Sequence, residues 1–187
     1  MKQRYINEIQ NENQVYLINK AVKKNWNPEN ILKINNIGIN GFKKEEMESL
    51  EQSIEELNEK ELAQYFREEF DGQQLISITD GLYDKLNEKQ MKLLANPEFD
   101  RWQMNEIRKG FDAGLSYEEV KSYAKSELDN NQMSEIREKL VEKKEKVVSK
   151  KANLKKKNKE IEETYIESIE TLRKIVEAKD NYTLRTF

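Results

Sequence analysis

The sequence contains no cysteine and no histidine. It therefore has no disulfides, thiolate metal sites or cysteine nucleophiles, and it lacks the commonest general base and metal ligand. A glycine-rich phosphate loop, a nucleophile elbow and metal-ligand spacing are also missing from it. Carboxylates alone can act as acid and base or hold Mg²⁺, but acidic residues are abundant here and point to no single site. We predict that the protein is not an enzyme and requires neither a cofactor nor a metal ion.

Glycine and proline are scarce, with 6 and 2 residues among 187. Glu, Lys, Gln, Leu and Ile dominate instead, and this composition favours helix almost throughout. Apolar residues recur at regular spacing, which predicts a folded chain rather than a disordered one. No apolar run approaches the length of a membrane span, and Met1 to Tyr5 lead into no apolar segment. We expect an all-α cytoplasmic protein without membrane contact.

A bipartite repeat runs through most of the chain. Its first motif is an apolar residue, Asp, then Gln three residues after the Asp, with further apolar residues at helical spacing. Copies begin at Phe70, Phe99 and Leu128, 29 residues apart, while a weaker copy begins at Phe42 and a degenerate one near Asn11. The periodicity indicates a repeat architecture.

A second motif follows every copy except the one at Leu128, and it has the same pattern of an apolar residue, a capping residue and an apolar stripe. These second motifs begin at Trp26, Leu57, Leu86 and Leu115. Pairs such as Asp100 with Gln103 are capping boxes, so each motif predicts a helix start. We interpret the repeated Asp and Gln as caps rather than as a polar site, and Trp26 as the apolar residue that packs beside a cap.

Caps lie about 13 to 16 residues apart, which predicts helices of roughly ten to twelve residues joined by short turns. Gly110 and Gly114 suit a helix end and the tight turn after it. One hairpin cannot bury its own apolar face, so about four to five units are expected to stack into a short curved array over residues 1–140. The predicted units lie near residues 10–41, 42–69, 70–98, 99–127 and 128–140, and Lys43 and Lys139 depart from the repeat pattern.

The best copy resembles a short helical repeat found in proteins of prophages, plasmids and conjugative elements of low-GC Gram-positive bacteria. It reads Phe99-Asp100-x-x-Gln103-Met104-x-x-Ile107-Arg108-x-Gly110-Phe111-x-x-Gly114-Leu115. The resemblance covers roughly residues 42 to 140. It implies a mobile-element setting and an interaction module, and it implies no reaction.

Residues 141–187 lack the second motif and read as an extended, basic, amphipathic helix. Residues 139–159 hold 10 Lys against 2 Glu, whereas residues 1–137 hold 19 Lys/Arg against 26 Asp/Glu. The candidate residues for binding nucleic acid or an acidic partner are Lys150, Lys151, Lys155, Lys156, Lys157 and Lys159. A solvated helix surface is the other explanation of this lysine run. Apolar residues from Ile161 to Val176 form a helical face that is free to dock on the array, a partner or a second copy.

Trp102 stands where the other copies have Gln73 and Asn131, so the repeat's core does not require it. An exposed tryptophan is a candidate binding hot spot, although packing against an adjacent helix also explains it. Together with Arg101 and Arg108 it forms our candidate partner-binding set.

Three functional hypotheses follow. The leading one is a non-enzymatic helical-repeat protein that binds a protein or a protein–nucleic acid complex, as a mobile-element inhibitor of a nucleic-acid-targeting host defence, similar in role to anti-CRISPR proteins. The second is an accessory protein of element replication or transfer that binds nucleic acid through its lysines. The third is a homodimeric scaffold paired through residues 140–176.

Overall fold

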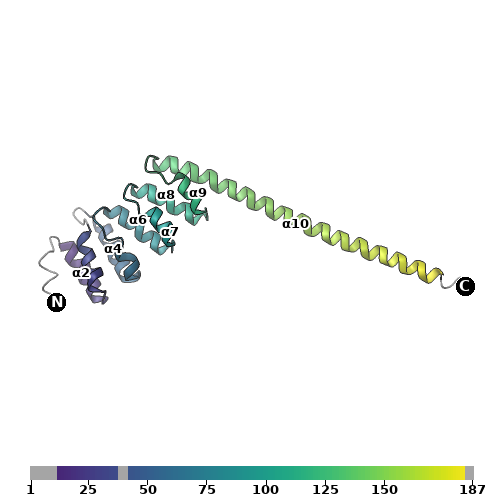
Figure 1. Cartoon of the computed structure of the whole chain (residues 1–187), viewed down its shortest axis with the longest axis horizontal. Coiled ribbons are helices and arrows are strands. Elements are labelled where there is room, and N and C mark those ends of the chain that lie inside the picture. The colour runs from purple at the N-terminus through teal and green to yellow at the C-terminus, as the bar shows by residue number, and fades with distance from the viewer. Residues whose placement is uncertain (1–11, 38–41, 184–187) are drawn as a thin grey trace. The chain divides into compact units, whose positions relative to one another are not determined.

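The structure, a computed structural model, describes residues 12–37 and 42–183, which form helices and turns without any strand (Figure 1). The helices are α2 (Glu12–Lys23), α3 (Pro28–Lys33), the 3-10 helix η1 (Ile34–Asn36), α4 (Lys44–Glu56), α5 (Glu59–Ala63), α6 (Gly72–Tyr83), α7 (Glu88–Leu94), α8 (Arg101–Asp112), α9 (Tyr117–Tyr123) and α10 (Asn130–Thr183). The predicted all-α fold with a long C-terminal helix is confirmed. The chain divides into two compact units, Met1–Leu140 and Val141–Phe187, whose described residues we call the body and the tail. Residues 10–11 and 38–41 of the first predicted repeat unit lie outside the described residues.

The predicted capping boxes are present at the helix starts. In α8 the Asp100 side chain accepts a hydrogen bond from the Gln103 N–H at 2.8 Å, and the Gln103 oxygen accepts one from the Asp100 N–H at 2.8 Å. The same reciprocal pair opens α6, α7, α9 and α10. At α4 only half of the box exists, because Lys43 carries no acceptor; its N–H donates to Glu46 at 2.8 Å.

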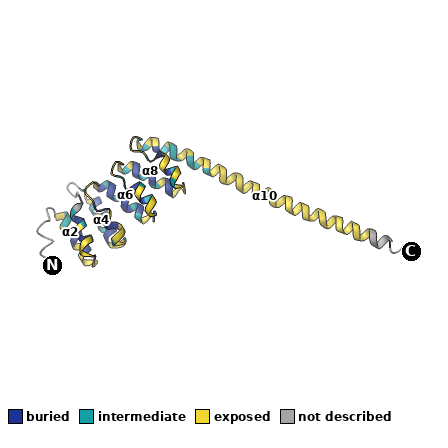
Figure 2. Cartoon of the chain, viewed as in Figure 1, coloured by how far each residue is buried: buried dark blue, intermediate teal, exposed yellow. Residues whose placement is uncertain are grey.

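The body is built of helical hairpins of unequal arms. The first helices pack against one another in chain order, α2 on α4, α4 on α6 and α6 on α8 (Figure 1), and buried residues lie where they meet (Figure 2). The second helices, α3, α5, α7 and α9, have only 6, 5, 7 and 7 residues. The predicted length of ten to twelve residues is therefore wrong for these arms.

The turns after the short helices α7 and α9 are each held by the glutamine of the preceding first helix. Gln103 Nε2 donates to the carbonyl oxygens of Ser126 at 3.1 Å and Leu128 at 2.6 Å. Gln74 makes the equivalent two bonds to the turn before α8, at 3.0 and 2.7 Å. Non-helical backbone in a packed body needs such partners for its carbonyls. One side chain thus caps its own helix through its oxygen and fixes the next unit through its nitrogen.

Gly110 lies inside α8 rather than at its end, so that part of the prediction is wrong. A β-carbon on Gly110 would lie 1.9 Å from the Tyr123 hydroxyl oxygen, so α9 approaches α8 this closely only because glycine has no side chain. Gly81 is equivalent in α6, where a β-carbon would meet Leu94 at 2.5 Å. Lys139 occupies the equivalent position in α10. Its side chain is tolerated because no second helix follows α10 in the described part of the chain.

The turns that reverse the chain after α6 and α8 each use a left-handed residue, whereas the C-cap of α4, Leu57, is extended. Gly114 has φ 72° after α8, as predicted for the tight turn, and the equivalent Lys85 has φ 57° after α6. The N–H of Leu115 donates to Gly110 O at 3.0 Å, which is the longer hydrogen bond of a Schellman motif. Lysine bears a steric cost in this conformation that glycine avoids.

We expect Lys85→Gly to raise the free energy of unfolding by about 0.5–1 kcal/mol, because it removes the left-handed penalty at an exposed site. The reverse exchange, Gly114→Lys, should lower that free energy by about 1 kcal/mol. Urea denaturation of both variants measures the two changes. If both shift stability in the same direction, the assignment of these turns is wrong.

The tail carries no buried side chain among its described residues. Every residue from Glu145 to Ala178 is exposed (Figure 2). Ion pairs one helical turn apart, such as Glu142 with Lys146 at 3.3 Å and Arg173 with Glu177 at 2.9 Å, lie along its surface. Exposed pairs of this kind add only about 0.3–0.5 kcal/mol each. No helix within the described ranges is long and apolar enough to cross a membrane.

Candidate partner-binding surfaces

Trp102 is the most exposed large apolar residue of the body, with 60% of its surface accessible. It is the second residue of α8, a position that the Asp100 cap fixes. The sequence left open whether it packs against a neighbouring helix, and the structure places it in solvent. Trp26 is buried instead, and its ring stacks on Phe66 at 6.2 Å between ring centroids.

Arg101 joins Trp102 to a polar chain that crosses three helices. Its guanidinium lies 5.5 Å from the centroid of the Trp102 ring, within the range of a cation–π contact. Its Nη1 donates to the Gln73 side-chain oxygen on α6, and Gln73 Nε2 donates to Glu46 on α4. Arg101 therefore contacts both the Trp102 ring and the Gln73 side chain of α6.

Arg108 is used inside the body. Its Nη1 lies 2.6 Å from Asp80, and its Nε and Nη2 lie 3.0 and 2.9 Å from Asp84. Only 19% of its side chain is exposed. Both carboxylates belong to the α6 segment, so Arg108 fastens α8 to α6 and its charge is already balanced there.

The six candidate lysines all lie on the exposed tail. Lys156 pairs with Glu160 at 3.9 Å and Lys159 with Glu163 at 3.7 Å. The remaining four form no ion pair with any residue that the structure describes; they are Lys150, Lys151, Lys155 and Lys157. Their charges are consequently available to an anionic partner.

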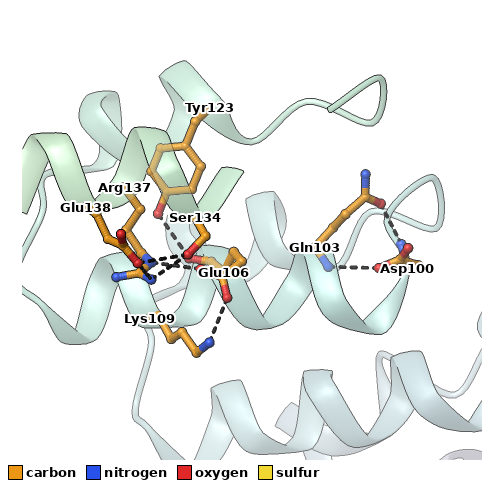
Figure 3. Close-up of polar contacts among 8 residues, drawn as sticks. All are labelled: Asp100, Gln103, Glu106, Lys109, Tyr123, Ser134, Arg137 and Glu138. Atoms are coloured by element: carbon orange, nitrogen blue, oxygen red, sulfur yellow. Dashed lines mark hydrogen bonds and ion pairs between the residues drawn. The ribbon is translucent and has the colours of Figure 1, made fainter. Parts of the chain in front are cut away.

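Glu106 is the centre of a buried network that the sequence did not reveal (Figure 3). Its carboxylate lies 2.8 Å from Arg137 Nε and 2.7 Å from Lys109 Nζ, and the Tyr123 hydroxyl donates to its backbone oxygen at 3.1 Å. Burial by itself raises the pKa of Glu106, but hydrogen bonds from Lys109 and Arg137 outweigh it and hold the pKa below its usual value. Burial also raises the pKa of Tyr123. This network joins α8, α9 and α10.

A second charged cluster joins α2 to α4 at the other end of the body. Lys20 Nζ lies 2.5 Å from Glu51 and 3.2 Å from Glu55, and the Tyr16 hydroxyl donates to Glu51 at 2.5 Å. The hydrogen bond from Lys20 and then that from Tyr16 lower the pKa of Glu51. These side chains are partly exposed, so the cluster contributes little to stability.

The described parts of the chain contain no group of three or more acidic side chains arranged to hold a metal ion. Among the positions predicted from the sequence, the structure brings Arg101 next to Trp102, assigns Arg108 to an internal contact and places the lysines on the separate tail. No family model, curated protein or solved structure matches this chain.

Proposed function

We propose that this protein is a non-catalytic binding protein whose body docks on a protein, or on a protein–nucleic acid complex, through Trp102. The observation that carries the proposal is the 60% exposure of this side chain on a body whose other tryptophan is buried. Tryptophan and arginine are the residues most enriched in binding hot spots. Arg101 lies beside the ring and is itself tethered to Gln73, so little side-chain freedom remains to be lost on binding.

The biological role that we propose follows from the resemblance of the repeat to those of mobile elements. A protein of this kind acts by occupying a surface of its target, and it needs no reaction of its own. We propose that the target is a host complex that attacks nucleic acid. Stoichiometric binding is sufficient for such inhibition.

Trp102→Ala is expected to weaken binding to the protein partner by about 30-fold or more, the effect of losing a hot-spot residue. The measurement is a pull-down from a nuclease-treated lysate of a low-GC Gram-positive bacterium, followed by mass spectrometry and titration of the recovered partner. The melting temperature should stay unchanged, because the indole packs into no core.

Leu32→Ala is the matched control, since Leu32 is an exposed apolar residue of the same body at 42% accessibility. A partner that the wild type and the Leu32 variant retain and that the Trp102 variant loses supports the proposal. If every partner survives the loss of Trp102, the proposal fails.

A second candidate function is nucleic-acid binding by the tail. It is favoured by the four lysines that form no ion pair with the described residues. The same pull-down separates the two candidates. Nucleic acid that is recovered alone, and that is lost on nuclease treatment or on neutralising Lys150 to Lys159, would support the accessory role; affinity should then fall steeply with salt.

A further inference from the structure

The tail exposes an amount of apolar surface that a single helix in water does not usually leave uncovered. Ten of its large apolar side chains are between 44% and 68% accessible: Val147, Val148, Leu154, Ile161, Tyr165, Ile166, Ile169, Leu172, Ile175 and Val176. Exposed apolar patches of this extent mark interaction sites.

The spacing of these residues is that of a two-stranded coiled coil. One series falls at intervals of seven or its multiple, namely Leu140, Val147, Leu154, Ile161 and Ile175. A second series lies four residues after each position of the first. It is polar at Lys144, Lys151 and Asn158 and apolar at Tyr165 and Leu172. A parallel pair in register would therefore stack lysine on lysine inside its seam.

Charge divides the tail into two halves. Residues 141–159, the basic half, hold 9 Lys and 2 Glu, whereas residues 160–177, the acidic half, hold 6 Glu against Arg173 and Lys174. Two parallel copies would align basic with basic and acidic with acidic. Two antiparallel copies align the basic half of each with the acidic half of the other, which is the arrangement that electrostatic complementarity favours.

An antiparallel alignment also matches the apolar residues. When two copies are centred near residue 159, four apolar residues of the basic half face apolar residues of the acidic half in the second copy, whereas Ile161 and Ile175 face Asn158 and Lys144. The facing pairs are Leu154 with Tyr165, Val147 with Leu172, Val148 with Ile169, and Val141 with Val176. The same alignment places Lys155 opposite Glu162 and Lys151 opposite the small Ser168. Only Ile166 among the ten exposed residues lies off this seam.

The buried area is sufficient for a stable pair. Val141 replaces Ile166 in the count, so each copy contributes ten apolar side chains. Burying one such side chain removes roughly 60–120 Å² from water, so twenty reach about 1,200 Å² or more. This is the lower bound of specific protein interfaces, which bury about 1,200–2,000 Å².

We propose that residues 141–176 of two copies of this chain pair as an antiparallel coiled coil. The pairing concerns the tail alone and goes beyond the binding role of Trp102. It gives the unpaired lysines of the basic half an intermolecular partner of opposite charge, and it covers the apolar seam.

The first test is the mass of the full chain by light scattering after nuclease treatment. We expect twice 22.3 kDa for the wild type at high micromolar concentration. Leu154→Asp should give the monomer mass, because it places a charge in the seam, while the thermal transition of the body stays unchanged. Ser149→Asp is the matched control on the outward face, and it should remain a dimer. A monomeric wild type, or one that forms larger species only with added RNA or DNA, would overturn the proposal.

The second test reads the orientation, and the absence of cysteine makes it clean. Val147→Cys and Leu172→Cys are made in separate chains, mixed and mildly oxidised. The mixture should form a disulfide dimer, and neither variant should do so alone, since antiparallel pairing separates the two thiols of a Val147→Cys pair by about 37 Å along the helix axis. Disulfides formed by each variant alone would instead show a parallel pair. Both tests are independent of Trp102→Ala, which should leave the dimer intact.

Discussion

Gly110→Ala is expected to lower the free energy of unfolding by about 1–2 kcal/mol. The new methyl group would lie 1.9 Å from the Tyr123 hydroxyl oxygen, and Tyr123 is fully buried and hydrogen-bonded to Glu106 O at 3.1 Å. Overpacking of this kind costs about 1–3 kcal/mol and sometimes more. The better helix propensity of alanine returns at most about 1 kcal/mol. Thermal or urea denaturation measures the difference.

Two further variants separate this clash from a general effect of replacing glycine. Gly81→Ala should cost less, because the nearest obstacle is the Leu94 methyl group at 2.5 Å, the end of a flexible side chain. Tyr123→Phe added to Gly110→Ala should restore part of the stability, since it removes the colliding oxygen. A Gly110 variant as stable as the wild type would show that α9 does not cross α8 as described.

Arg137→Met is expected to cost about 3 kcal/mol at neutral pH. Arg137 and Glu106 have side chains 15% and 7% exposed, and removing one partner of a buried pair leaves the other charge unbalanced, at a cost of about 3–5 kcal/mol. Lys109 remains beside Glu106 at 2.7 Å, so the lower end of that range is expected. Lys139→Met is the control, because that lysine is 77% exposed, and its effect should stay within about 0.5 kcal/mol.

The pH dependence of the stability cost of Arg137→Met tests whether the charge on Glu106 causes that cost. Its pKa is lowered in the folded protein, so its stabilising contribution is present above the ordinary glutamate pKa of about 4.3 and is lost as the pH falls through the folded value. The cost of Arg137→Met should therefore shrink in acid, where Glu106 is protonated and no longer requires the cation. A cost that stays constant from neutral pH to about pH 3 would contradict this explanation.

Helix starts were predictable because capping signals are local. Asp100 and Gln103 lie three residues apart, and their box follows from residue type and spacing alone. Gln103 also donates hydrogen bonds to Ser126 and Leu128 in the turn before α10. These partners lie 23 and 25 positions away in the sequence, and the bonds were not predicted. Residue type alone gives no clear signal for this second role, because the same capping position holds Glu46 in the first helix α4 and the amide Gln90 in the second helix α7.

The candidate site was predictable only in part. Trp102 stood out because it breaks the repeat, and its exposure agrees with that reading. Arg108 did not reveal its internal role, because Asp80 and Asp84 lie in another unit and the sequence does not show which charges meet. The same reason hid the Glu106 network, whose members come from three helices.

The order in which neighbouring units are joined also bears on how the protein is made. Gln103 reaches carbonyls in the turn just ahead, and Arg108 reaches back one unit to Asp80, so the bonds that fasten the body span about one repeat of sequence. A ribosome adds a repeat of 29 residues roughly every 1.5 to 6 seconds. Each hairpin can therefore dock on its finished predecessor while synthesis continues. The tail is synthesised after the hairpins of the body. If the tails of two chains pair as proposed, the bodies are therefore already folded when the chains meet.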